Sequence, residues 1–254
     1  MFTLNDKEKT FLNQLAKSLP DRKRGKRGPD KISKEILLKE IFKLIKTNCG
    51  WRNIEHSSTC RNYINECQRR SKIKNYFNYL TIEYKRFKQK KFIVDSSLLH
   101  SYNIPKGVSY SGKSHNYCTK LTLGINDKYI PLEFNFGKGS KSDSEQLNKM
   151  LANMNKLPLE MYLDMGYENY ERRRYLKSKN CQVRMKQTVR GKNRKRGPKF
   201  VFKDEHKEER QKIERFFAWI KSFKLIRFRT IRNSSLFHAF VIIVLSFIAF
   251  RLKL

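Results

Sequence analysis

Acidic residues are scarce in this chain of 254 residues, which has 23 Asp and Glu against 57 Lys and Arg and a formal net charge of +34. A protein with this much positive charge repels itself unless a polyanion neutralises it, so nucleic acid is the leading partner. An anionic membrane surface is second, because it favours a basic amphipathic helix over dispersed charge. Hydrophobic residues reach 39% and aromatic residues 13%, which is enough for a core and excludes a merely basic, disordered tail.

Paired cysteines, a secretion signal and a long apolar span are also missing. The five cysteines are scattered without a C-x-x-C pair, which argues for reduced thiols in an intracellular protein and against a disulfide framework or zinc site. The N-terminus has no apolar signal core. The apolar run 236–250 is shorter than the span of about 20 residues that crosses a membrane, so it predicts a core helix. We expect His238 to lie in that helix and the other histidines, including His206, to lie at the surface. We also expect a soluble protein.

The first ninety residues predict helices joined by basic and glycine-containing links. Residues 1–30 form a basic segment whose end, D-R-K-R-G-K-R-G-P, could lie along phosphates or serve as a solvated tether. Residues 31–90 suggest a helical DNA-binding domain of helix-turn-helix type, although basic three-helix bundles without groove recognition are also common. Helices are expected over 2–18 capped by Asn5, 34–47 capped by Ser33, 57–70 capped within 57–59, and 72–90.

From residue 91 the pattern changes to short β-rich runs alternating with helices. The order predicts an α/β domain over 91–254, a mixed sheet with helices on its faces. Strands are expected over 92–95, 120–125, 129–136, 159–163 and 183–186, with a hairpin turn at Asn126-Asp127. Helices are expected after a polar loop at 137–144, with Asp143 or Ser144 as the cap, over 168–179 after a turn at Gly166, and over 205–223 after a second basic loop at 189–199.

The helix over 205–223 carries an acid at the edge of its apolar face. Arg210, Glu214, Phe217 and Lys221 fall within an arc of about 60° at 100° per residue, beside an apolar stripe. Taken alone, the segment is explained by an ordinary Arg–Glu pair at i,i+4 spacing.

Two further acids, Asp95 and Asp164, end apolar strands. A charge beside a core costs stability unless something neutralises it, and Mg²⁺ does so with carboxylate oxygens while leaving positions for water and phosphate. Two such ions about 3.5–4 Å apart can activate a nucleophile and stabilise a leaving oxygen in phosphoryl transfer. Any one of these acids could simply cap a turn. Together with Glu214, they favour a metal site acting on a phosphodiester.

These motifs resemble those of bacterial insertion-sequence transposases of the DDE class, over roughly residues 31–252. The group to which the chain is most similar carries the signature Tyr-x2-Arg-x3-Glu-x6-Lys. Arg210, Glu214 and Lys221 stand at those spacings, with Lys207 in the tyrosine position. V-D-S-S at Asp95, D-x-G-Y from Asp164, R-K-R before the last helix and G-W-R in the N-terminal region are also typical of the group.

The resemblance implies a fold and a site. The fold is a ribonuclease H-like mixed sheet flanked by helices, with an N-terminal all-α helix-turn-helix-like domain. Asp95, Asp164 and Glu214 would form the catalytic, metal-binding triad for two Mg²⁺ ions, for which Mn²⁺ may substitute, and Asp143 would support it. Residues expected to contact DNA are Arg52, Arg194, Lys195, Arg196, Arg210 and Lys221.

The resemblance also implies a function. The protein would bind the terminal inverted repeats of its own element, hydrolyse phosphodiester bonds there and use the new 3′-hydroxyl to attack target DNA. Its partners would be double-stranded DNA and a second copy assembled on it, without a membrane, in the bacterial cytoplasm at the nucleoid. One alternative is a decayed or repurposed copy that binds DNA without cutting. Another is an RNA-binding protein, which explains the charge but leaves the acids unexplained.

Overall fold

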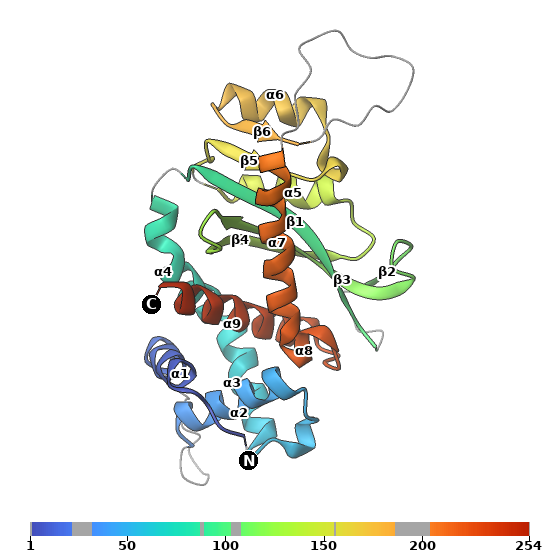
Figure 1. Ribbon diagram of the computed structural model, residues 1–254. Helices are drawn as coiled ribbons and strands as arrows, with labels where there is room; N and C mark the ends of the chain where they lie inside the picture. Colours follow the sequence, from blue (N-terminus) through green and yellow to red (C-terminus); the bar gives the residue numbers. More distant parts are fainter. Residues whose placement is uncertain are drawn as a thin grey trace. The chain divides into compact units, whose positions relative to one another are not determined.

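The computed structural model describes residues 2–21, 32–86, 89–102, 108–154, 156–185 and 204–253. The chain divides into two compact units (Figure 1). Unit 1 comprises Met1–Ile82, Leu99–Val108 and Trp219–Leu254, and unit 2 comprises Glu83–Leu98 and Ser109–Ala218. The C-terminal segment therefore belongs with the N-terminal helices in this division. The division into functional domains at 1–30, 31–90 and 91–254 stays a prediction.

Unit 1 is helical. Its helices are α1 (Asp6–Ser18), α2 (Lys34–Thr47), η1 (Trp51–Asn53), α3 (Ser57–Arg69), the first part of α4 (Lys72–Arg86), the end of α7 (Asp204–Ser222), α8 (Lys224–Arg227) and α9 (Ser234–Lys253).

Two of the expected helix caps in unit 1 are confirmed and one is wrong. Asn5 and Glu8 form a reciprocal capping box at the start of α1, and Ser33 accepts a hydrogen bond from the third residue of α2. Helix α3 begins after His56, which has a left-handed backbone. Its side chain makes no capping bond among the described residues. The serines expected to cap this helix lie inside it.

Helix α9 lies in the core of unit 1. Its side chains from Leu236 to Phe250, except His238, are buried, and α9 packs against α1 and α3. The Phe247 ring lies 5.2 Å from Phe11 and 5.3 Å from Phe42, in edge-to-face contacts. Of the described helices, α9 is long and apolar enough to cross a membrane by length and composition, and 78% of its most apolar stretch is buried. That burial agrees with the expected core helix, although the helix is longer than its apolar run suggested.

Unit 2 is built on one mixed sheet. Its strands are β1 (Lys91–His100), β2 (Ser109–Ser111), β3 (Asn116–Asn126), β4 (Pro131–Lys138), β5 (Glu160–Tyr162) and β6 (Gln182–Arg184). The strand order is β2-β3-β1-β5-β6, and β4 pairs with β3. Strand β3 runs antiparallel to β2 and β4, whereas β5 runs parallel to β1 and β6. This mixed sheet is consistent with the ribonuclease H-like fold.

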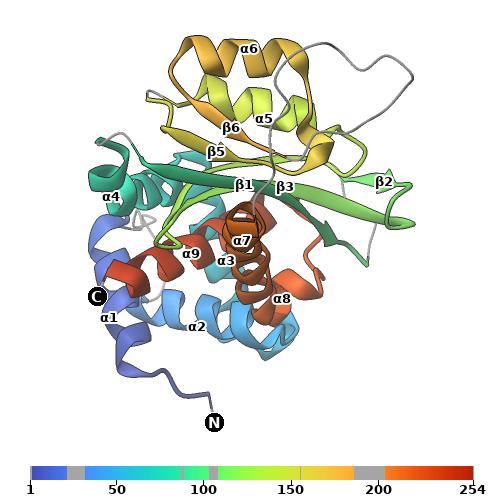
Figure 2. The ribbon, with the colours of Figure 1, turned by 45° about the horizontal axis from the view of Figure 1, so that its top comes forward.

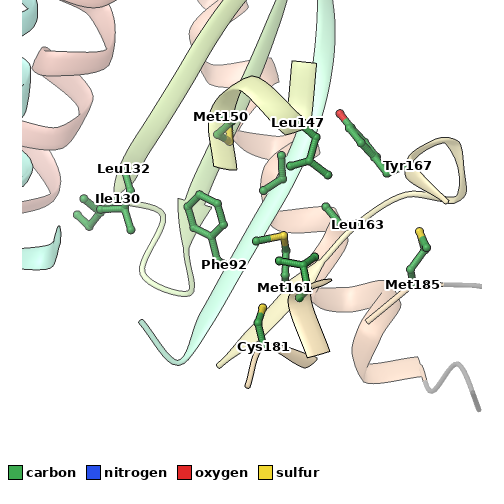
Figure 3. Close-up of a cluster of buried hydrophobic side chains, with 12 residues drawn as sticks. Phe92, Ile130, Leu132, Leu147, Met150, Met161, Leu163, Tyr167, Cys181 and Met185 are labelled. Atoms are coloured by element: carbon green, nitrogen blue, oxygen red, sulfur yellow. The ribbon is translucent and has the colours of Figure 1, made fainter. Parts of the chain in front are cut away.

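Helices cover both faces of the sheet in unit 2. Figure 2 shows α5 (Asp143–Ala152) and α6 (Tyr170–Ser178) on one face and α7 on the other. Phe92 of β1 packs in a buried cluster with Met161 of β5 and Met150 of α5 (Figure 3), and Val94 belongs to the same cluster. A Cβ at Gly124 would lie 2.0 Å from the ring of Phe92, so the core needs a glycine there.

Three details of unit 2 differ from the expected elements. Strand β1 continues to His100, so Asp95 lies within a strand rather than at its end. Strand β2 was not expected, because three residues are too few to show an alternating pattern. Ser142, rather than Asp143 or Ser144, caps α5 by accepting a hydrogen bond from the amide of Glu145.

Candidate active site

The pairing of β1 with β5 brings two predicted acids into register. In this parallel pair Ile93 lies opposite Tyr162, and Asp95 and Asp164 each follow two residues later. Neighbouring strands lie about 4.8 Å apart, and side chains alternate between faces. Both acids therefore project from the face opposite the Phe92 core. Asp164 stands directly before η2 (Met165–Tyr167) and has an extended backbone.

Helix α7 lies over this face and contacts both β1 and β5. Lys91 of β1 forms ion pairs with Glu209 at 2.8 Å and Glu205 at 3.3 Å. His206 packs against the ring of Tyr162 at 5.9 Å and is only 5% exposed. The expectation of a surface histidine was therefore wrong, because the apolar face of α7 includes this position.

Arg210, one turn after His206, reaches two of the predicted acids. Its guanidinium lies 3.2 Å from Asp164 and 3.9 Å from Glu214. The pairing with Glu214 follows from the i,i+4 spacing, whereas the closer contact with Asp164 depends on the fold. Asp164 and Glu214, which are 50 positions apart (214 − 164 = 50), thus share one arginine.

Asp95 completes the cluster from β1. Its carboxylate accepts a hydrogen bond from the Ser96 amide at 2.8 Å. Burial raises the pKa of Asp95 from 3.8 to about 6, while repulsion from Asp164 and Asp143 adds to the rise and the Ser96 amide and Arg210 oppose it. Burial therefore outweighs the amide and the guanidinium, which favour the ionised form.

Ser96 links the two aspartate motifs. Its hydroxyl lies 2.7 Å from the hydroxyl of Tyr167, which belongs to the D-x-G-Y motif, and 2.7 Å from that of Thr122 on β3. Arg172 of α6 donates to the Tyr167 carbonyl at 2.8 Å, which fixes the segment after Asp164. Thr122 and Arg172 were not identified from sequence, because the burial of both side chains is visible only in the folded chain.

A comparison with protein families assigns the chain that carries this arrangement to a family. The family model described as the transposase DDE domain matches residues 86–248, which is more than half of the chain. The chain belongs to the transposase DDE domain family. The matched segment includes Asp95, Asp164 and Glu214, and membership implies that DNA is the substrate and that divalent metal ions are used. No curated protein matches the chain at a significant level.

Asp143 of the transposase domain also lies near these acids. Lys120 of β3 donates to its carboxylate at 2.8 Å and to the carbonyl of Lys141 at 2.5 Å. Lys120 is only 8% exposed, and its position in an apolar strand was a signal that sequence analysis missed. The Lys120–Asp143 pair thus joins the sheet to the start of α5.

The remaining residues expected to contact DNA are distributed over the transposase chain. Arg52 is exposed in η1, next to Trp51, whose ring lies 6.3 Å from that of Phe240. Lys221 lies in the last turn of α7, in the portion assigned to unit 1, and burial lowers its pKa. Lys207, at the signature tyrosine position, is exposed. Arg194, Lys195 and Arg196 lie outside the described residues.

The carboxylates of the transposase domain suit a metal ion in their chemistry, although not in their present arrangement. Within the described part of the chain, no three His, Cys, Asp or Glu side chains are grouped closely enough to hold a metal as they stand. Arg210 contacts two of the three acids and provides their positive charge. The donors themselves are carboxylate oxygens, which suit Mg²⁺. The residue types fit a magnesium site in which Arg210 has moved.

Proposed function

We propose that the protein is an insertion-sequence transposase that binds the terminal inverted repeats of its element, cuts the strands there and joins the new 3′-hydroxyl to target DNA. The observation that carries this proposal is the placement of Asp95, Asp164 and Glu214 around Arg210 in a transposase DDE domain. The excess of Lys and Arg provides the attraction for DNA.

In this proposal Asp95, Asp164 and Glu214 hold two Mg²⁺ ions, or Mn²⁺ in their place. When bound, such ions supply activation of a water or 3′-hydroxyl and stabilisation of charge on phosphate oxygens. Ser96 and Tyr167 fix the backbone on either side of the site through their 2.7 Å hydrogen bond. Arg210, which contacts Asp164 and Glu214, would be displaced from these carboxylates by bound cations and could then meet a DNA phosphate, the partner that the signature implies.

DNA-end recognition is assigned to residues 31–90. There α2 and α3 are joined by a turn that begins at Asn48, which has a left-handed backbone. This arrangement suits a helix-turn-helix in which exposed residues of α3, such as Arg61 and Arg69, face the major groove. Arg52, Lys221 and the 194–196 segment would add backbone contacts, and two copies would assemble on the paired ends.

A second candidate is a DNA-binding protein that no longer cuts. Lys207 at the signature tyrosine position favours it, since the change touches the helix that carries Glu214. The contacts of Arg210 with Asp164 and Glu214 are compatible with it as well. The two candidates differ in metal-dependent nicking.

The test is nicking of a labelled duplex that carries the inverted repeats flanking the gene, in Mg²⁺ or Mn²⁺. Asp164→Asn should reduce cleavage by at least about 10²-fold, the scale seen when one preorganised electrostatic group is removed. DNA binding should be unchanged or slightly stronger, because a carboxylate without metal repels phosphate. Asp127→Asn is the matched control, since this exposed residue lies in the β3–β4 turn and should cut like the wild type.

Equal cleavage by wild type and Asp164→Asn would rule out Asp164 as a ligand. If the wild type binds the ends but cuts in neither metal, the second candidate is correct. Lys207→Tyr should then be tested, because restoring cleavage would locate the defect at that position.

A further inference from the structure

A pocket of about 240 Å³ opens beside the candidate active site within unit 2. Its walls come from β1, the end of β2 and the turn that follows, β3, and the loop between β4 and α5. At about 30 Å³ per water molecule it has room for roughly eight waters, so a phosphodiester group with part of its hydration shell fits. None of the predicted triad lines it.

Ser96 connects this pocket to the triad. Ser96 lines the pocket, and its amide donates to the Asp95 carboxylate at 2.8 Å. Asp143, at the start of α5, also lines the pocket. A group bound in the pocket therefore contacts the residue that follows Asp95 in the chain without touching a proposed metal ligand.

The lining is cationic and rich in hydroxyl groups. Lys113, Lys120 and Lys141 line it together with Ser111 and Ser140. The ammonium of Lys120 is already bound to Asp143, the acid in the lining, so these two charges balance.

The other two lysines leave an excess of positive charge. Lys113 is exposed and forms no ion pair with any residue that the structure describes. Lys141 pairs with Glu145 at 3.3 Å, in a contact where both side chains are more than a third exposed and which is therefore weak. Two ammonium groups from different loops are thus available to an anion.

The wall that carries Lys141 is held in place before any ligand arrives. The Ser140 amide donates a hydrogen bond to the hydroxyl of Ser109 on β2 at 2.9 Å. The Ser109 hydroxyl in turn donates to the Ser140 hydroxyl, also at 2.9 Å. Gly139 packs so closely on β3 that a Cβ there would lie 2.3 Å from the sulfur of Cys118. A preorganised wall lowers the cost of ordering on binding, as expected for a site that must position a ligand.

We propose that this pocket binds a backbone phosphate of the DNA strand being processed, adjoining the phosphate on which the carboxylates act. Lys113 and Lys141 are positioning residues that hold the strand in line with the triad. The inference rests on the proposed function, since it assumes that DNA reaches Asp95. It adds a phosphate subsite that the family signature does not contain.

The test compares the full-length wild type with Lys113→Gln/Lys141→Gln. The control is Lys128→Gln/Lys149→Gln, which removes the same charge from exposed sites of unit 2 and also one ion pair of Glu145. Affinity for a mixed-sequence duplex is measured without divalent metal over a range of salt concentrations. The pocket variant should bind several-fold more weakly, and its slope of log K against log[salt] should be smaller by about 0.9 for each phosphate that the protein no longer neutralises.

Two further measurements make the outcome specific. Lys113→Arg/Lys141→Arg should restore the salt slope, because the charge returns. Acetylation of the wild type, read by mass spectrometry, should be reduced by DNA at Lys113 and Lys141 and unchanged at Lys128. A wild-type slope in the pocket variant, or an equal change in the control, overturns the proposal.

These measurements need no cleavage, so the two proposals fail separately. A protein that shows the expected slopes and protection but never cuts retains the phosphate subsite and loses the transposase activity. A protein that cuts its ends while the pocket variant keeps the wild-type slope loses only the subsite.

Discussion

Replacing Asp95 by Asn should stabilise the metal-free protein above pH 6. The pKa of Asp95 is raised from 3.8 to about 6, first by burial and then by the charges of Asp164 and Asp143. Between these pH values the folded protein binds more protons than the unfolded chain. The free energy of unfolding therefore falls as pH rises from about 4 to about 6 and stays lower above that range. Asn removes the charge and so removes this penalty.

The size of the effect follows from the shift. About two pKa units at 1.36 kcal/mol each set an upper bound of roughly 3 kcal/mol, and we expect about 1–3 kcal/mol because Asp95 is not fully buried. The Asn side chain has the same shape and can still accept the Ser96 amide hydrogen bond. With about 2–4 °C per kcal/mol for a chain of this size, Tm should rise by roughly 2–12 °C at pH 8.

The assay is thermal and denaturant unfolding in EDTA at pH 8 and at pH 4, for the wild type, Asp95→Asn and Asp127→Asn. The gain should be present at pH 8, nearly absent at pH 4, and missing in Asp127→Asn. Adding Mn²⁺ should stabilise the wild type and leave Asp95→Asn almost unchanged, because a ligand that binds the folded state raises its stability. A destabilised Asp95→Asn at pH 8, or a gain of equal size at both pH values, would refute the electrostatic reasoning.

Three other substitutions test separate parts of the structure. Arg210→Gln should bind Mn²⁺ about 2–30-fold more tightly by calorimetric titration, because two half-exposed ion pairs worth about 0.2–1 kcal/mol each no longer compete; unchanged or weaker binding contradicts this. Tyr167→Phe should lower the free energy of unfolding by about 0.5–1.5 kcal/mol in denaturant titrations through loss of the bond to Ser96, and an effect near zero would argue against that bond. Gly124→Ala should cost about 1–3 kcal/mol by overpacking against the ring of Phe92, and Phe92→Leu should recover part of that loss.

The sequence predicted best the features that depend on neighbouring residues. The caps of α1 and α2 follow from Asn5 and Ser33, since a capping side chain bonds a backbone amide only a few residues away. The alternation of strands and helices from residue 91 was also readable from local periodicity. The three-residue strand β2 was not, because its pairing with β3 is visible only in the folded chain.

The residue types of the site could be predicted from the sequence, but only part of its geometry could. Motif spacing identified Asp95, Asp164 and Glu214, but the register that aligns β1 with β5 arises from pairing between distant segments. Lys120 and Thr122 were overlooked because each stands in an otherwise apolar strand, where periodicity alone assigns no role to a polar residue. Each is less than a tenth exposed, a burial that only the folded chain reveals.

The contact between Arg210 and Asp164 could not be predicted from sequence. Its i,i+4 partner is Glu214, yet the closer carboxylate, at 3.2 Å, is that of Asp164 on another element. A single guanidinium therefore neutralises two proposed metal ligands, and cations that take those ligands must release it. The same guanidinium also lowers the pKa of Asp95, against the larger rise caused by burial, so Arg210 acts on all three acids, by contact with two and by its charge on the third. In the proposed function this couples the arrival of metal to the release of a cation toward DNA, so that metal and substrate binding reinforce each other.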